Sequence, residues 1–203
     1  HSASSSPVAE MVRRYPIRSR HVIAHIRKAT QGRVALENTH PFMRELWGRY
    51  WIFAHNGDLK NYAPSHTGSY RPVGETDSEA AFCDLLHTLT ARFGDCAPAD
   101  DVLGNAIAAW AADTARHGVF NFLLSNGDTL FAHCATNLAY IERCAPFTKA
   151  HLVDEDVTVD FSEVTTPNDR VAVIATVPLT DNETWTTLAP GEFAQFREGV
   201  RVR

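Results

Sequence analysis

The chain has 203 residues, of which 44% are hydrophobic, a size and composition that fit one globular domain and exclude disordered and fibrous proteins. The formal net charge is −5 and no cluster of lysine and arginine is present, so we expect no nucleic-acid partner and no membrane partner. The longest apolar run, residues 171–179, contains Thr176 and Pro178 and is far too short to span a bilayer. The 4 cysteines form no CxxC pair, which indicates reduced thiols and a cytoplasmic location.

The first half of the chain predicts one short helix, two strands and one long helix. The short helix is expected over Pro7–Arg14, with proline in its first turn. Residues 21–29 and 49–54 are apolar enough to be strands and are separated by a loop. Residues 76–79 have the sequence Thr-Asp-Ser-Glu, a capping box that begins a helix whose apolar residues keep helical spacing as far as Gly94.

The second half predicts one further helix and then a series of strands. The helix is expected from about Val102 to His117, where Gly118 ends it. The strands are expected in a hairpin over 119–135 that turns at Ser125–Asp128, and at 138–144, 170–179 and 191–202. This grouping of strands, two helices and more strands favours a layered α+β fold in a single domain over alternating βαβ units.

Four polar clusters lie at the edges of the predicted elements: AHIRKAT (24–30), NTHPF (38–42), AHNGDL (54–59) and GETDSE (74–79). Each has an ordinary structural explanation by itself. A lone histidine such as His40 is usually packed in a loop, and Asp77 suits any helix N-terminus. Asn56-Gly57 is a strong turn signal, because both residue types tolerate positive φ. A functional interpretation therefore depends on the four clusters together.

Taken together, the clusters have a common chemical logic. Arg27 carries a planar guanidinium suited to a carboxylate, and Asp77 carries an anion suited to an ammonium group. A site that holds both would bind the head of a free α-amino acid. The Asn56 amide and the Gly57 backbone N–H are donors of the kind that stabilise a tetrahedral oxyanion. An amino-acid clamp beside such donors predicts acyl chemistry on a side-chain amide, for which glutamine is the natural substrate.

The four clusters, in this order and at this spacing, resemble the class II glutamine amidotransferases, whose glutaminase domain is an N-terminal-nucleophile hydrolase. The stretches GVFNFLLSNG and TTPNDRVAVIATVPLTDNETW resemble the stand-alone, single-domain branch of that family. The resemblance implies an α+β fold, a four-layer αββα sandwich of two stacked, mainly antiparallel sheets. It also implies that Arg27 and Asp77 bind the substrate carboxylate and amino group, that Asn56 and Gly57 form the oxyanion hole, and that Thr30 and His40 line the pocket.

The nucleophile of the family is a cysteine at the mature N-terminus, whose own α-amine serves as the base. His1 is not that residue, and none of the 4 cysteines suits the role from its position. We therefore expect residues 1–203 to be one glutamine amidotransferase type-2 domain lacking its N-terminal segment, with the first strand and the nucleophile upstream of His1. The chain as printed should lack hydrolytic activity.

The resemblance implies no cofactor and no metal. The expected substrate is glutamine or another γ-glutamyl amide. The ammonia would be released into solution by a stand-alone hydrolase or passed to a separate accepting subunit. The sequence leaves the oligomeric state, the physiological substrate and the acceptor open.

Two other interpretations stay open at this point. A metal hydrolase is suggested by His21, His25, His40 and His55, although no carboxylates stand nearby at metal-ligand spacing. A regulatory module that binds an amino acid without cleaving it would keep the clamp and lack the nucleophile. The residue that follows the initiator methionine in the whole gene product distinguishes this module from the enzyme.

Overall fold

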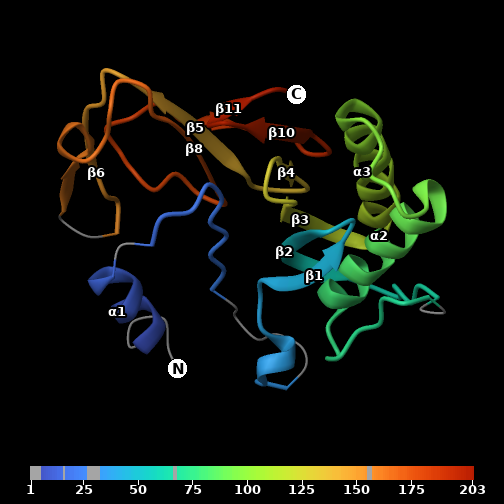
Figure 1. The fold of residues 1–203 in the computed structure, drawn as a ribbon. Helices are drawn as coiled ribbons and strands as arrows, with labels where there is room; N and C mark the ends of the chain where they lie inside the picture. The colour runs from blue at the N-terminus through green and yellow to red at the C-terminus, as the bar shows by residue number, and fades with distance from the viewer. Residues whose placement is uncertain (1–5, 16, 27–32, 66–67, 155–156) are drawn as a thin grey trace.

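The computed structural model describes residues 6–15, 17–26, 33–65, 68–154 and 157–203 (Figure 1). A six-stranded antiparallel sheet has the order β1 (Phe42–Leu46), β2 (Arg49–Leu59), β3 (Gly118–Ser125), β4 (Leu130–His133), β10 (Phe193–Arg197), β11 (Val200–Arg201). A three-stranded sheet has the order β8 (Arg170–Ala175), β5 (Ala139–Cys144), β9 (Thr186–Thr187), and a third sheet pairs β6 (Lys149–His151) with β7 (Thr158–Asp160). The helices are α1 (Pro7–Arg14), α2 (Asp77–Phe93) and α3 (Asp100–Thr114), with 3-10 turns η2 (Leu36–Asn38), η3 (Ala115–His117) and η4 (Phe161–Glu163).

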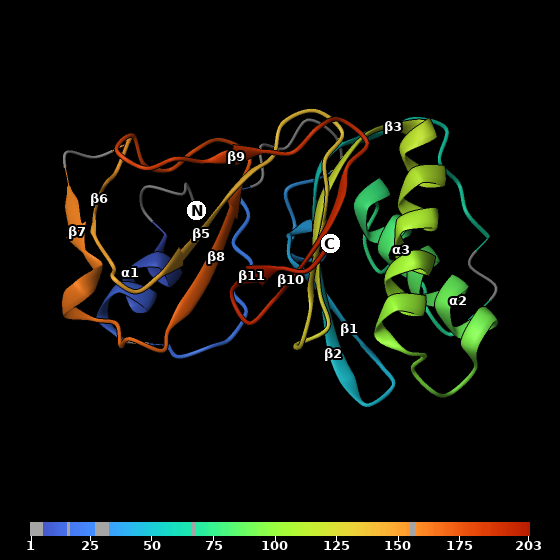
Figure 2. The same ribbon diagram turned by 90° about the horizontal axis from the view of Figure 1, so that it is seen from above.

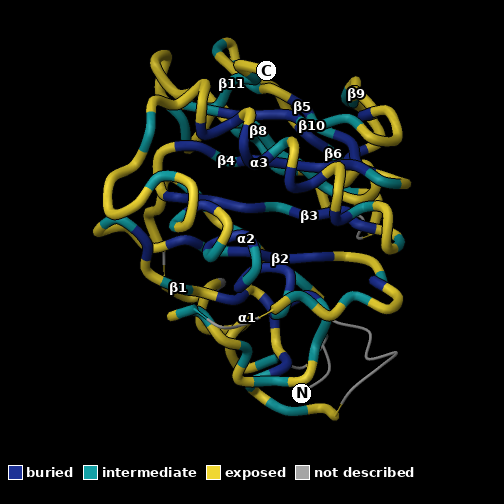
Figure 3. Tube along the Cα trace, turned by 90° about the vertical axis from the view of Figure 1, so that its right-hand side faces the viewer, coloured by how far each residue is buried: buried dark blue, intermediate teal, exposed yellow. Residues whose placement is uncertain are grey.

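Helices and sheets are stacked in layers. Helices α2 and α3 cover one face of the six-stranded sheet, and β5 and β8 lie on its other side (Figure 2). Aromatic rings fill the layer under the helices; the rings of Phe53 on β2 and Phe82 on α2, for example, stack with centroids 5.3 Å apart. The inner strands are accordingly buried along most of their length (Figure 3). The protein thus has a mixed α/β fold built on antiparallel sheets.

A second, smaller core lies between the two larger sheets. Phe196 on β10 and Leu188 are fully buried in it, and Tyr140 on β5 and Ile174 on β8 pack against them. The stacked sheets of the expected sandwich are therefore present. Helix α1 lies on the side of the small sheets (Figures 1 and 2), but its side chains Val8, Met11 and Val12 are 47–64% exposed and do not pack as a layer. The outer helical layer of the four-layer sandwich stays a prediction.

Most elements of the chain agree with their predicted positions. Helix α1 is confirmed over Pro7–Arg14, and α2 begins after Thr76, whose hydroxyl accepts the Glu79 N–H at 3.2 Å as one half of the predicted capping box. Gly94, with φ of +66°, ends α2 as expected. The hairpin of β3 and β4 is confirmed, whereas the strand predicted at 191–202 is a hairpin of β10 and β11.

The strand predicted at 21–29 is wrong for residues 21–26, and residues 27–29 lie outside the described residues. Residues 21–26 are in no strand, although their burial alternates as in one. Val22 and Ile26 are 74% and 80% exposed, so their side of the segment meets no neighbour in the described chain. A strand exists only when a partner pairs its backbone groups, and local sequence cannot supply that partner.

Candidate active site

Strand β2 runs without interruption through Asn56 and Gly57. It pairs with β3 in a continuous register, in which Asn56 lies opposite Asn121 and Gly57 lies opposite Phe120. The strand continues to Leu59, five residues beyond the predicted end at Ala54. The interpretation of Asn56-Gly57 as a tight turn is therefore wrong. Both residues are exposed, so the strand presents them at the surface.

Gly57 is required by a close approach rather than by its φ angle. Its φ lies outside the positive range, contrary to the expectation from the Asn-Gly pair. A Cβ atom at this position would lie 1.8 Å from the Val119 carbonyl oxygen and 2.6 Å from the His55 ring. Neither β3 nor the buried ring can yield without moving the sheet, so the absence of a side chain is a condition of this strand pairing.

Asn121 fixes the backbone of Asn56 from the neighbouring strand. The buried Asn121 amide donates to the Asn56 carbonyl at 3.1 Å and to the Thr136 hydroxyl at 3.0 Å. Its carbonyl oxygen accepts the N–H groups of Ala135 and Thr136 at 2.8 and 3.0 Å. This residue was not predicted from the sequence. Its signal was a single amide inside the apolar strand GVFNFLLS, since a buried amide must find partners.

The Asp77 carboxylate joins the end of β2 to the start of α2. Its Oδ2 accepts the Leu59 N–H at 2.7 Å, and its Oδ1 accepts the Ser78 N–H at 2.8 Å. No ion pair connects this half-buried carboxylate to any residue that the structure describes. Asp77 is therefore held at the helix N-terminus, where a negative charge is stabilised, and no cation of the described residues pairs with it. It lies on the same structural unit as Asn56 and Gly57.

The loop before α2 is held by two buried polar side chains. The Glu79 carboxylate accepts the N–H groups of Val73 and Gly74 at 3.0 and 2.7 Å and pairs with Arg44 of β1. Glu79 thus serves the loop rather than completing the capping box. From the cluster NTHPF, Asn38 accepts the Glu75 N–H at 2.9 Å. These bonds fix the chain that leads into Asp77.

Two buried histidines complete the connections. His55 lies between β3 and α2, with Nε2 3.0 Å from the Val119 carbonyl and Nδ1 2.8 Å from the Ser78 hydroxyl. Burial lowers its pKa, so the ring is neutral at neutral pH. The His40 ring lies 4.3 Å from the His25 ring and 4.7 Å from the Phe42 ring.

The four sequence clusters are therefore in contact with one another. Hydrogen bonds join NTHPF, AHNGDL and GETDSE, and the contact between His25 and His40 joins AHIRKAT to them. The structure brings Asn56, Gly57 and Asp77 together at one end of β2. Arg27 and Thr30 lie outside the described residues. The contacts of His40 place it beside the first cluster, and its role toward a substrate stays a prediction.

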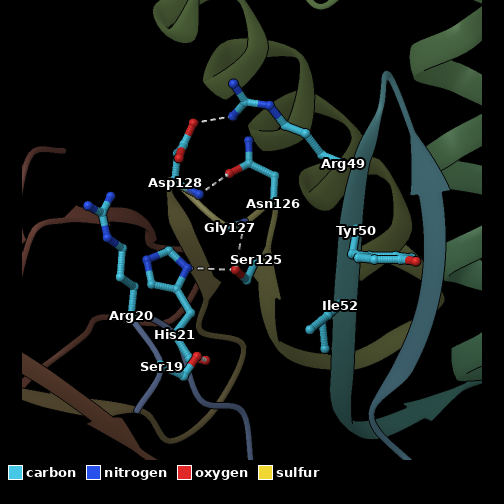
Figure 4. A pocket seen from close by; sticks show the side chains of 10 residues that line it. All are labelled: Ser19, Arg20, His21, Arg49, Tyr50, Ile52, Ser125, Asn126, Gly127 and Asp128. Carbon is cyan, nitrogen blue, oxygen red and sulfur yellow. Dashed lines mark hydrogen bonds and ion pairs between the residues drawn. The ribbon is translucent and has the colours of Figure 1, made fainter.

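An open pocket of about 370 Å³ lies at the opposite end of β2 (Figure 4). It is bounded by residues 19–21, by Arg49, and by the β3–β4 turn, where Arg49 pairs with Asp128. The His21 ring lies 2.6 Å from the Ser125 hydroxyl there. A second pocket, of about 400 Å³, lies between α2 and α3. Neither contains Asn56, Gly57 or Asp77.

The described residues supply no ligand set for the metal hydrolase considered from the sequence. No three histidine, cysteine or acidic side chains among them come together as metal ligands, and His25 and His40 meet as packed rings. A membrane-crossing helix is likewise not found in the described part of the chain, where every helix is too short or too polar.

The fold and the site define a mixed α/β domain that presents an amide, a strand glycine and a held carboxylate at one end of its main sheet. The family model of the class II glutamine amidotransferases matches residues 1–203, and the chain belongs to this family.

The chain is similar to several proteins of that description. It is 56% identical over 198 residues to "Putative glutamine amidotransferase YafJ" of Escherichia coli K12, which covers 98% of this chain and 78% of that protein. A Haemophilus influenzae protein of the same description is 49% identical over 201 residues, covering 99% of this chain and 68% of its own length. The crystal structure of a predicted glutamine amidotransferase from Pseudomonas aeruginosa PA01 has a TM-score of 0.75 and 53% identity, over 83% of this chain and 66% of that one.

Proposed function

We propose that the protein cleaves the side-chain amide of glutamine or of a related γ-glutamyl compound. The observation that carries this proposal is the bond between the Leu59 N–H and the Asp77 carboxylate. Through it, a held carboxylate open to a cation and the exposed Asn56-Gly57 pair belong to one rigid unit. An α-amino acid bound by its head at Asp77 could extend its side chain along β2 toward the two donors.

The substrate head is held by opposite charges. Asp77 accepts the ammonium group, and Arg27 binds the carboxylate through two parallel N–H groups. Charge-assisted hydrogen bonds of this kind contribute roughly 1.5–3 kcal/mol each. Thr30 and His40 line the same pocket. Because the head group carries most of the ground-state affinity, the scissile amide is positioned rather than tightly bound.

The oxyanion is stabilised only after attack on the amide carbon. A thiolate forms a bond to that carbon, and the carbonyl electron pair moves to the oxygen, which accepts bonds from the Asn56 amide and the Gly57 N–H. The N-terminal α-amine, which took the thiol proton, gives it to the leaving nitrogen as the intermediate collapses. Ammonia is expelled and a γ-glutamyl thioester is left, which water hydrolyses to glutamate and the free thiol. Asn121 assists indirectly, since it holds the backbone from which Asn56 projects.

The nucleophile of the proposed reaction is an N-terminal cysteine upstream of His1, in an N-terminal-nucleophile fold of four layers. The cysteines of the printed chain support this assignment by their surroundings. Burial raises the pKa of Cys83 to about 11 and also raises the pKa of Cys134, which makes both poor thiolates. Cys96 and Cys144 are exposed, one in the loop after α2 and the other at the end of β5.

The test uses the protein expressed from its whole gene and a diazo-ketone analogue of glutamine, which alkylates the attacking thiol. We expect ammonia release from glutamine and a label on the N-terminal cysteine, with both abolished by replacing that cysteine with alanine. A label on any of the four internal cysteines would contradict the assignment. Release of ammonia in the absence of a second substrate would indicate simple hydrolysis. If glutamine is not cleaved under these conditions although the N-terminal cysteine is labelled, a separate accepting subunit is indicated.

An amino-acid-binding module is the alternative that the same clamp supports, because Asp77 is held whether or not a nucleophile is present. The discriminating observation is the mature N-terminal residue. Glutamine binding without ammonia release, in a protein whose mature N-terminus is not cysteine, would establish the module instead.

A further inference from the structure

The Ser78 hydroxyl lies between two acceptors. Its oxygen is 2.8 Å from Nδ1 of His55 and 3.2 Å from Oδ1 of Asp77. A hydroxyl carries one proton and can donate it to only one of them at a time. The protonation state of the histidine decides which acceptor receives that proton, because the ring nitrogen changes from acceptor to donor when it is protonated.

The neutral ring leaves no choice of tautomer. Nε2 of His55 lies 3.0 Å from the Val119 carbonyl, which can only accept, so the ring proton is on Nε2. Nδ1 is then an acceptor, and Ser78 donates to it. In this arrangement the Ser78 backbone N–H is the one donor to Oδ1 of Asp77 among the residues that the structure describes, which leaves this oxygen acceptor capacity for a ligand.

Adding one proton to the ring reverses the arrangement. Nδ1 becomes a donor to the Ser78 oxygen, and the Ser78 proton turns to Oδ1 of Asp77. The carboxylate then has one acceptor position fewer and a positive charge beside it. The charged groups that face the ring are Asp77 from α2 and Asp58 from β2, while β3 contributes the Val119 carbonyl and the Phe120 ring.

We propose that Ser78 and His55 are positioning residues, which keep the Asp77 carboxylate available to the substrate ammonium group only while His55 is neutral. The inference rests on the proposed function, since it concerns how the amino-acid clamp is controlled. Neither residue touches the substrate. Acidification should therefore weaken binding of the substrate head before any change in the fold.

The test is calorimetric titration with L-glutamine of the protein from the whole gene in which the N-terminal cysteine is replaced by alanine. The titration is repeated from about pH 8 down to about pH 4.5, well below the ordinary histidine pKa, because burial lowers the pKa of His55. Without its N-terminal cysteine this protein is expected to bind glutamine and not to cleave it. We expect affinity to fall about ten-fold on acidification, the loss of one charge-assisted contact. In Ser78→Ala the affinity at about pH 8 should be retained, and the fall should shrink to about two- to three-fold, because only the ring charge remains.

Ser125→Ala is the matched control. Ser125 makes a similar contact with a histidine ring, that of His21, and lies opposite Ile52 of β2, away from Asp77. This variant should show the full ten-fold fall. An equal fall with and without Ser78→Ala, or no fall without it, would overturn the inference and leave the proposed function intact. Failure of the protein with Ser78 intact to bind glutamine at any of these pH values would overturn both.

The ring itself provides a second measurement that needs no variant. Nitrogen NMR of the histidine side chains distinguishes a protonated from an unprotonated ring nitrogen. We expect Nε2 of His55 to carry the proton at about pH 8 and Nδ1 to gain one on acidification. A proton on Nδ1 at about pH 8 would contradict the arrangement from which the inference follows.

Discussion

Two histidine–serine pairs lie toward opposite ends of β2, and their contact distances hardly differ. His55 and Ser78 are 2.8 Å apart and buried, whereas His21 and Ser125 are 2.6 Å apart beside an open pocket (Figure 4). The difference lies in what else each serine contacts. Ser78 contacts the Asp77 carboxylate, and Ser125 accepts the Gly127 N–H and stabilises a turn. The same pair of residue types thus serves a candidate site at one end and local structure at the other.

The largest expected contrast is between the effects of replacing Asn56 and Asn126 on the catalytic rate. Asn56→Ala should lower kcat by about 10²–10³, the usual loss for one oxyanion donor, with little change in KM. Asn126→Ala removes an acceptor that holds the Asp128 and Thr129 N–H groups, so it should cost about 1–2 kcal/mol of stability and leave kcat unchanged. Steady-state kinetics and denaturant unfolding of both variants, in the protein from the whole gene, separate the two roles. A near-normal kcat for Asn56→Ala would remove the distinction.

The next contrast is in the stability cost of replacing Gly57 and Gly127 by alanine. Gly57→Ala places a methyl group into the Val119 carbonyl, and we expect a cost of about 3 kcal/mol or more, since backbone must move. Gly127 has a positive φ of +90°, and a Cβ atom added there would meet nothing within 4 Å, so Gly127→Ala should cost only about 1–2 kcal/mol. Urea unfolding of the two variants measures the difference. Equal costs would mean that β2 and β3 can separate locally, contrary to the close approach between Gly57 and Val119.

The two aspartates form the next contrast. Asp77→Asn should weaken glutamine binding about ten-fold or more, because the ammonium group loses its counter-charge. Helix α2 should persist, since Thr76 still caps it. Asp128→Asn loses only an exposed ion pair with Arg49, which contributes at most about 1 kcal/mol, and should leave binding unchanged. If calorimetry found unaltered affinity in Asp77→Asn together with slightly lower stability, Asp77 would serve the helix alone.

The smallest expected effect is a dependence of stability on pH that both ends share. Burial lowers the pKa of His21, His55 and His133 in the folded state. Below about pH 6.5 the unfolded chain then binds more protons than the folded one, so stability should fall as the pH falls through this range. Carboxylates with lowered pKa, such as Glu183, add their loss only at more acidic pH. Thermal unfolding between about pH 7 and pH 5 checks this, and a constant melting temperature would contradict it.

Local signals in the sequence predicted the helices well, because their causes are local. Thr76 caps α2, Gly94 ends it, and the apolar spacing between them places Phe82 in the core. The sequence also predicted that the four polar clusters meet, because each side chain has a chemical function that only the others complete, and the described parts of all four are in contact. That they form one substrate site stays a prediction. Three of these clusters are connected directly by hydrogen bonds in the structure.

What the sequence could not predict depends on pairing between distant segments. Asn56-Gly57 has the composition of a turn, yet β3 runs alongside and keeps it extended. Residues 21–26 have the composition of a strand, yet the described chain offers them no partner. Asn121 was overlooked because its role depends on a loop after β4 that only the fold brings to it.

The bond between Leu59 and Asp77 has a consequence for measurement. A backbone N–H at the end of a strand would ordinarily exchange its hydrogen with solvent within a short time, whereas this one is donated to a carboxylate. Its exchange rate therefore reports whether that carboxylate is in place. The Leu59 amide therefore reports on the contact between the sheet and the helix without any added label. Its hydrogen exchange should become slower still when an amino acid is bound at Asp77.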